Sequence, residues 1–336
     1  MSYTRWVLVF AAGFTVVAGC GGTVPQAGLP HVAQSRGAGA ADSSSIDKLL
    51  YVASTEREVL VYDYETHAPV QRLHVEDPAN GFCVDRIGDV WILEYGDVKS
   101  PVVEYPHGGT VPLRKLRSNG TPVGCAVDPT SGNLAVANLE TKSGRSTLQI
   151  FRPSGERGIA YKINACSSMF SAAYDHNGNL YIEGSDPDDR SALCELPHGG
   201  NKLRPVTANV EFRSRLGVMW DGKHITLAAR HLGGPLQTII YQMAEDASGN
   251  LKKVGSTLLR DSGCGVTSTM QPFIVGKKNT PANTAQGNEV VAVNFGAHCG
   301  SNLEFWSYPA GGNFKSRVGV FHFFEPKVGA AVSIRG

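Results

Sequence analysis

The chain is patterned as short apolar runs separated by clusters of turn-forming residues. Gly (39 residues) and Pro (18 residues) are abundant, and they stand mostly between the apolar runs. No segment keeps the 3.6-residue apolar period that a long amphipathic helix needs. Many short strands bounded by turns are typical of an all-β protein, so we expect an all-β fold.

One phrase occurs four times along the chain. A small residue is followed four positions later by an aspartate, then by turn residues and an apolar strand. The aspartates are Asp85, Asp128, Asp175 and Asp221, at spacings of 43, 47 and 46 residues. An aspartate in a tight turn accepts backbone N–H groups, and a following Gly or Asn adopts positive φ, so we interpret these four residues as structural turn residues.

A second marker follows about 20 residues after the aspartate in several units. It is an aromatic residue or Leu, then Pro, then a Gly-rich turn, at residues 105–109, 196–200 and 308–312, with a related FRPSG at 151–155. Each unit therefore predicts four strands. A period of 40 to 50 residues with four strands per unit indicates a β-propeller, in which neighbouring blades bury the faces that one sheet cannot bury alone.

Six blades account for the chain. Four begin near residues 81, 124, 171 and 217, and a fifth covers 264–321 with a polar insertion at 276–288. The sixth is split: residues 49–73 supply three strands, and the C-terminal segment 328–334 supplies the innermost one. This pairing of the two chain ends removes the free edges that an open ring would leave.

The phrase D-x-x-G-N-L-Y-V, seen most clearly after Asp175, resembles the NHL-repeat and gluconolactonase-like six-bladed propellers over nearly all of residues 48–336. The resemblance implies the fold, but it leaves function open because propellers include hydrolases, lyases, redox enzymes and pure binding scaffolds.

The N-terminus resembles a bacterial lipoprotein signal. A basic start and a short apolar segment end in Val-Ala-Gly-Cys at residues 17–20, and the apolar segment is too short for a spanning helix. We expect residues 1–19 to be a signal peptide, Cys20 to carry lipid, residues 20–47 to be a flexible tether and 48–336 to form the propeller. An ordinary signal peptide with a chance cysteine is the alternative.

The charge of the chain limits the partners that we expect, and its cysteine content indicates a cellular compartment. The formal net charge is +1 without a basic stripe, so no nucleic acid is expected as a partner. Six cysteines remain beside Cys20, which suits up to three disulfides in an oxidising compartment, while buried free thiols are the alternative. We rank the pairs Cys264–Cys299 first, Cys166–Cys194 second and Cys83–Cys125 third; the last pair is offset by one position between its two strands.

Propeller sites usually lie over the central channel, on loops that enter the first strand or leave the second strand of a blade. We therefore look for candidate site residues where the second strands end. Glu94, Asn138, Glu183 and Asn294 offer oxygens that could hold Ca²⁺ or Mg²⁺, as the gluconolactonase-like resemblance implies. The family's Pro-Asn-Gly and Pro-Asp-Gly stretches have no counterpart here, and solvated rim residues are the favoured interpretation. His231 and His298 are candidate catalytic residues by resemblance to the virginiamycin-lyase type of propeller, with plain loop residues as the alternative.

Two hypotheses for function follow. The favoured one is an exported, lipid-anchored binding or scaffold protein of the cell envelope, with an unknown protein or carbohydrate ligand. The alternative is a metal-dependent lactonase- or lyase-like enzyme with its site at the channel mouth. No cofactor is required by the first hypothesis, and the second needs a divalent metal.

Replacement of the lipobox cysteine tests the anchor. We expect Cys20→Ala to leave the precursor uncleaved by the lipoprotein signal peptidase and without an acyl chain, because the thioether cannot form. Metabolic labelling with palmitate and partition into detergent would measure this. Equal labelling and equal partition of mutant and wild type would contradict the lipoprotein interpretation.

Overall fold

The computed structural model describes residues 43–54, 57–96, 100–141, 145–212, 216–230, 237–263, 269–276, 288–296, 300–321 and 329–335. All of them belong to the compact unit Ala40–Gly336. They form six antiparallel sheets of four strands, with two short 3-10 turns, η1 (Ser43–Ser45) and η2 (Asn164–Cys166). The chain is therefore an all-β, six-bladed propeller, as the repeat predicted.

From the axis outward, the first sheet is β24 (Ala330–Ile334), β1 (Lys48–Ala53), β2 (Glu58–Asp63) and β3 (Pro69–His74). The second is β4 (Ala79–Val84), β5 (Val90–Glu94), β6 (Pro101–Tyr105) and β7 (Arg114–Arg117). The third is β8 (Gly120–Val127), β9 (Leu134–Thr141), β10 (Thr147–Phe151) and β11 (Ile159–Tyr161).

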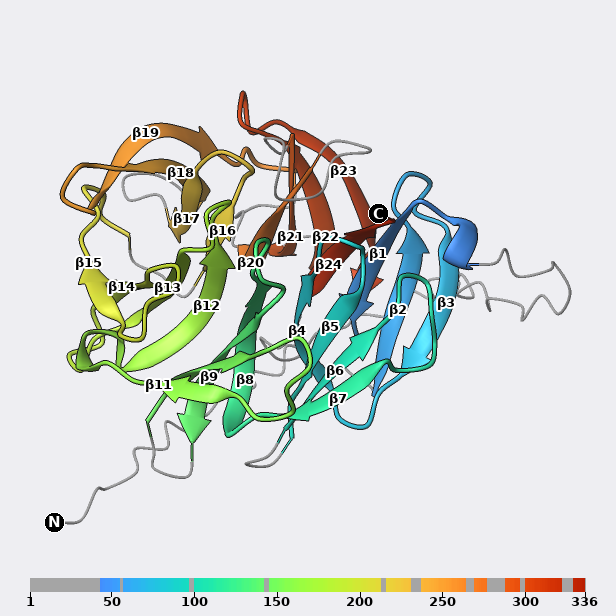
Figure 1. Ribbon diagram of the computed structural model, residues 1–336. Helices are drawn as coiled ribbons and strands as arrows, with labels where there is room; N and C mark the ends of the chain where they lie inside the picture. The colour runs from blue at the N-terminus through green and yellow to red at the C-terminus, as the bar shows by residue number, and fades with distance from the viewer. Residues whose placement is uncertain are drawn as a thin grey trace, which may run out of the picture. The chain divides into compact units, whose positions relative to one another are not determined.

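The fourth sheet is β12 (Ser168–Tyr174), β13 (Leu180–Ser185), β14 (Ser191–Leu196) and β15 (Arg204–Val206). The fifth is β16 (Val218–Trp220), β17 (Ile225–Arg230), β18 (Thr238–Glu245) and β19 (Leu251–Leu258). The sixth is β20 (Thr269–Val275), β21 (Glu289–Gly296), β22 (Gly300–Ser307) and β23 (Phe314–Phe321). Figure 1 shows the innermost strands gathered around the centre and the outermost strands at the periphery.

The apolar runs of the sequence are the middle strands of the blades. Every residue of β5, β6 and β10 is buried, because both faces of these strands are covered by neighbouring blades. The outermost strands β3 and β7 instead bury single residues between exposed ones. Continuous apolar runs therefore mark central strands and mixed runs mark outer strands.

The repeated aspartates lie in the turns that join first strands to second strands. Asp85 Oδ1 accepts hydrogen bonds from the backbone N–H groups of Ile87 (3.0 Å) and Asp89 (2.9 Å). Asp128, Asp175 and Asp221 accept backbone N–H groups in the same way. Gly88 has a φ of 95°, a conformation that needs a glycine.

Small residues let the innermost strands approach one another closely. A Cβ added to Gly124 on β8 would lie 2.6 Å from the carbonyl oxygen of Phe170 and 2.9 Å from the Cα of Ser171, both on β12. A Cβ on Gly81 would lie 3.2 Å from the carbonyl oxygen of Val123. The ring around the axis therefore depends on backbone-to-backbone packing at Gly81 and Gly124.

The ring closes by the predicted pairing of the chain ends. Strand β24 pairs with β1 from Lys48 opposite Ile334 to Val52 opposite Ala330. The side chain of His107, in the neighbouring blade, reinforces this junction: its Nε2 is 2.6 Å from the Ile46 carbonyl oxygen and its Nδ1 is 2.5 Å from Ser333 Oγ. Both ends of the propeller are thus fixed to the same sheet and to its neighbour.

Two disulfides are present among the described residues, Cys83–Cys125 and Cys166–Cys194. Cys264 and Cys299 lie outside the described residues, so the pair ranked first stays a prediction. The Cys83–Cys125 pair, ranked third because a one-position offset was expected to turn the two side chains to different faces, is confirmed, and that expectation was wrong. Adjacent blades pack opposite sheet faces against each other, so a one-residue offset turns the two side chains toward each other rather than apart. Both cysteines accordingly belong to one apolar cluster between the blades.

No helix within the described ranges is both long enough and apolar enough to cross a membrane.

Substitution of the axial glycine tests this packing. We expect Gly124→Ala to destabilise the protein by roughly 1–3 kcal/mol, because β8 and β12 must separate to admit a methyl group. The matched control is Gly155→Ala, whose added Cβ would find its nearest neighbour at an ordinary 3.6 Å. Urea unfolding of both variants measures the difference, and equal unfolding midpoints would contradict the close approach.

Candidate functional site

A cavity of about 650 Å³ occupies the channel between the innermost strands. At one end lies the ring of small residues, including Gly81, Gly124, Ser171 and Gly217. The other end opens at the turns that join first strands to second strands, where Ile87 and Trp220 are among the lining residues. The sequence predicted a site at the second-strand ends. The mouth of this cavity is instead on the opposite face of the propeller.

The four candidate ligand residues at the second-strand ends are buried and engaged with neighbours, so their interpretation as solvated rim residues was wrong. Glu94, Asn138, Glu183 and Asn294 are each 1% exposed or less. Glu94 Oε2 accepts the Asp77 N–H at 2.8 Å, and burial raises the pKa of Glu94. Asn294 Nδ2 donates to Glu304 Oε2 at 2.8 Å.

The remaining two residues contact their own inner strands or loops. Asn138 Oδ1 accepts a hydrogen bond from Ser118 Oγ, and Glu183 Oε2 lies 3.4 Å from Ser171 Oγ. Asn294 Oδ1 is buried and makes no hydrogen bond with the part of the chain described here. None of the four lines the channel cavity, and a cation shared between them stays a prediction.

The candidate catalytic residues His231 and His298, and the lipidation residue Cys20, lie outside the described residues.

A cluster of three carboxylates lies at the cavity mouth, of which only Asp85 was expected from the sequence, as a turn residue. Asp85, Asp89 and Glu104 each place a carboxylate oxygen within 4.8 Å of the others. Asp85 and Asp89 come from the turn between β4 and β5, and Glu104 from the end of β6. In the parts of the chain that the structure describes, this is the single group of three or more His, Cys, Asp or Glu side chains so arranged.

The strand register brings Glu104 to the mouth. Cys83, Trp91, Glu104 and Arg114 stand opposite one another across β4 to β7, so they share one face of this blade. All four line the cavity. Arg114 Cζ lies 5.3 Å above the Trp91 ring, and its Nη2 donates to the Gly155 carbonyl of the next blade at 3.0 Å.

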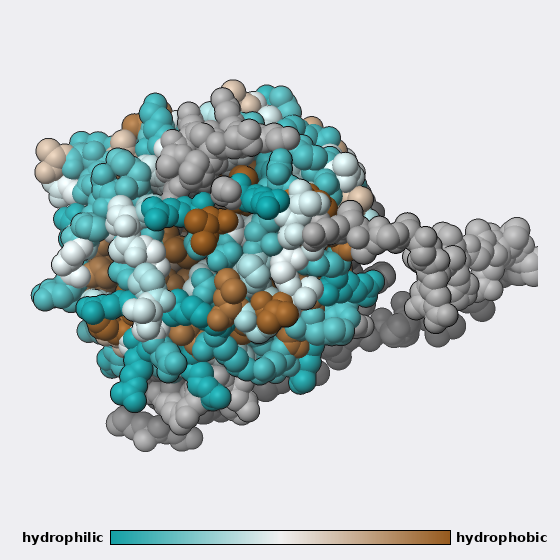
Figure 2. All heavy atoms as spheres, turned by 45° about the vertical axis from the view of Figure 1, so that its right-hand side comes forward, coloured by the Kyte–Doolittle hydropathy of each residue, from teal (hydrophilic) through white to brown (hydrophobic). Residues whose placement is uncertain are grey.

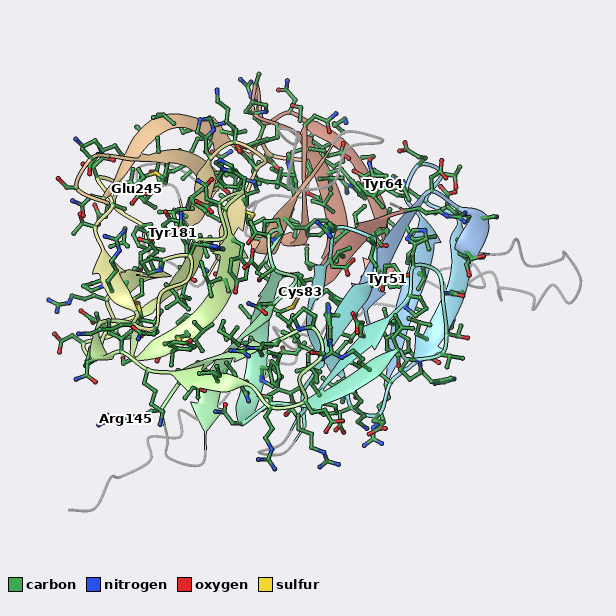
Figure 3. The ribbon with its side chains drawn as sticks, viewed as in Figure 1. Tyr51, Tyr64, Cys83, Arg145, Tyr181 and Glu245 are labelled. Carbon is green, nitrogen blue, oxygen red and sulfur yellow. A yellow bond between two sulfur atoms is a disulfide. The ribbon has the colours of Figure 1, made fainter. Side chains whose placement is uncertain are left out.

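The same cross-strand row occurs in another blade, with a different result. Tyr181, Glu195 and Arg204 stand opposite one another across β13 to β15. There Arg204 Nη2 lies 2.5 Å from Glu195 Oε2, a charge-assisted hydrogen bond. In the Glu104 row the nearest distance, from Arg114 Nε to Glu104 Oε2, is 3.9 Å. Figure 3 labels Tyr181 and Cys83, which mark the two rows.

The looser pairing of Glu104 with Arg114 affects the pKa of the Glu104 carboxyl. The pKa of Glu104 is raised to about 7, mainly by burial, with Arg114 lowering it and the charges of Asp89 and Asp85 raising it. Burial also raises the pKa values of Asp85 and Asp89. A carboxyl group that still holds its proton near neutral pH, in a cavity and beside other carboxylates, is typical of functional sites.

A signal for Glu104 is present in the sequence. The glutamate, the Pro-His-Gly-Gly turn and a later arginine occur at 104–114 and again at 195–204. The repeat shows that a glutamate faces an arginine twice. It does not show that Arg204 hydrogen-bonds to its glutamate while Arg114 donates to the next blade instead.

Glu104 should make stability depend on pH. Its pKa is about 7 in the folded state against 4.5 for a glutamate side chain in water, so between these values the folded protein binds the extra proton. This contribution is complete below pH 4.5 and is lost as the pH rises through 7. We expect the wild type to lose on the order of 2 kcal/mol relative to Glu104→Gln between pH 4.5 and 8.

Urea unfolding at several pH values measures the effect. Glu156→Gln, in an exposed loop, is the control and should follow the wild-type profile. Parallel profiles of the wild type and Glu104→Gln would show that Glu104 does not titrate differently on folding.

No protein-family model matches this chain, and no curated protein sequence matches it. Solved structures do match. A chain from the crystal structure of a nidogen/laminin complex has a TM-score of 0.57 at 12% identity, over 86% of this chain and 99% of that one. TolB from Acinetobacter baumannii has a TM-score of 0.59 at 15% identity, over 87% and 67% of the two chains.

A protein of unknown function from Bacteroides caccae is also similar, with a TM-score of 0.53 at 12% identity, over 86% of this chain and all of that one (100%). At these identities the likeness extends to the fold, and this chain is structurally similar to known propellers of the nidogen and TolB kind.

Proposed function

We propose that this protein is an exported, lipid-anchored binding protein of the cell envelope, and that its ligand enters the channel cavity. The ligand is a protein segment or a carbohydrate. The observation that carries the proposal is the cavity itself, about 650 Å³, walled by both apolar side chains and carboxylates. This volume lies within the range in which proteins enclose small ligands.

The mouth offers two kinds of contact. Trp220 and Ile87 supply apolar surface, and Ile87 is 59% exposed. Glu104 and Arg114 supply a hydrogen-bond acceptor and donors on one wall. A few polar groups among apolar ones are what give a pocket orientation and specificity for its ligand.

The disulfides and the structural likenesses support export and binding. Two disulfides suit an oxidising compartment outside the cytoplasm. One similar chain comes from a complex between two proteins, nidogen and laminin. The lipid anchor at Cys20 rests on the sequence alone.

A metal-dependent lactonase- or lyase-like activity is the second candidate function. It is favoured by one observation, the Glu104 carboxyl with a pKa of about 7 beside Asp85 and Asp89. Such a group can donate a proton near neutral pH. Metal analysis of the purified protein separates the two candidates, since a stoichiometric divalent ion supports the enzyme.

Two matched substitutions test binding at the mouth. Ile87 and Val254 are similarly exposed, at 59% and 57%, but only Ile87 lines the cavity. Against a panel of immobilised glycans and envelope peptides, we expect Ile87→Glu to weaken any interaction of the wild type at least tenfold, because it places a charge beside the carboxylates. Val254→Glu, on the outer strand β19, should change it less than twofold.

Equal losses in the two variants, at unchanged melting temperature, would place binding elsewhere on the molecule.

A further inference from the structure

The two disulfides occupy different surroundings. Cys166 and Cys194 are both fully buried, at 0% exposure, and join η2 to β14 within one blade. Cys83 and Cys125 join the innermost strands β4 and β8 of two adjacent blades, with their Cα atoms 5.6 Å apart. Figure 3 shows Cys83 near the centre of the ring of blades.

The inter-blade disulfide is part of the cavity wall. Both Cys83 and Cys125 line the channel cavity, whereas Cys166 and Cys194 do not. Cys83 is partly exposed and Cys125 is 8% exposed. A thiol small enough to enter the cavity can therefore reach this bond without unfolding the protein, while the Cys166–Cys194 bond is reached only after its blade opens.

We propose that Cys83–Cys125 is a reversible S-thiolation site in the channel wall, which takes small thiols of positive or neutral charge. The thiolate of the small molecule attacks one sulfur of the bond, preferably that of the more exposed Cys83. A new S–S bond forms between the thiol and Cys83, the Cys83–Cys125 bond breaks, and Cys125 leaves as a thiolate that takes a proton from water. No external oxidant or reductant is needed, because the step is an exchange.

The charge preference follows from the mouth through which the thiol enters. Asp85, Glu104 and Asp128 line the cavity against Arg86 and Arg114, and Asp89 adds a further carboxylate to the cluster. At pH 8 the acidic groups outnumber the basic ones, so a cationic thiol is attracted and an anionic thiol of the same size is repelled.

Thiolation has a consequence for the binding function, and this step rests on the proposed function. A group attached to Cys83 lies in the cavity, where we propose that the ligand binds. Thiolation and ligand occupancy then exclude each other. The exchange itself is measured without any ligand, so its failure and the failure of the binding proposal are distinguishable.

The experiment uses the full oxidised protein and two probes of similar size, cysteamine (cationic) and 2-mercaptoethanesulfonate (anionic). After incubation at pH 8, acid quenching and alkylation, mass spectrometry of peptides identifies which cysteines carry the probe. We expect Cys83 or Cys125 to be modified at least tenfold faster than Cys166 or Cys194. Peptides containing Cys264 and Cys299 differ in mass and are scored separately.

At equal thiolate concentration, cysteamine should react faster than the sulfonate at this bond. The ratio of the two rates should exceed the ratio measured with a small unstructured disulfide. Glu104→Gln should reduce that ratio. Circular dichroism during the incubation shows whether the fold is kept. Equal rates at the two disulfides, faster reaction at Cys166–Cys194, or no exchange before unfolding would each overturn the proposal, and a preference for the sulfonate would overturn its charge selectivity.

Discussion

The close approach of six innermost strands around one axis is the constraint on which the rest of this structure depends. At Gly124 the backbone of β12 is so near that a methyl group would lie 2.6 Å from a carbonyl oxygen. Hydrogen bonds also join the innermost strands of adjacent blades. The Val218 N–H donates to Ser171 Oγ at 2.8 Å, and Asn80 Nδ2 donates to the Pro122 carbonyl at 2.9 Å. Packing therefore requires the small residue at Gly124, whereas the φ of 122° at Gly217 is a local backbone reason for a glycine there.

The channel and its wall chemistry are results of this approach. The cavity between these strands is lined from the small residues to the turns that begin with Asp85 and Asp128. Side chains that share a sheet face with the axial residues then become cavity lining, including Cys83, Trp91 and Glu104. Elsewhere on the surface, Figure 2 shows apolar groups as small brown areas among hydrophilic ones. The mixture of a disulfide, an aromatic ring and a carboxyl in one channel wall is therefore set by strand register.

Much of the fold could be predicted from the sequence, because the repeat period, turn aspartates and apolar runs are local signals. Even the pairing of residues 328–334 with the first blade followed from counting strands, and β24 confirms it. The Cys83–Cys125 bond was underrated because strand alternation was considered within one sheet, while the bond forms between two. The sequence does distinguish Glu104 from Glu195 in one respect, because Asp89 stands where the other blade has Asn179. It does not show how each glutamate pairs with its arginine, at 3.9 Å in one row and 2.5 Å in the other.

The pairing of β24 with β1 also sets the order in which the molecule can be completed. The first blade needs Ala330–Ile334 as its innermost strand, so five blades can assemble during synthesis while the first lacks its axial member. Such widely separated pairing is entropically slow to form, because the loop that it closes is nearly the whole chain. A chain that crosses a membrane from its N-terminus would therefore remain an open ring until residues 330–334 emerge, and would close only on the far side.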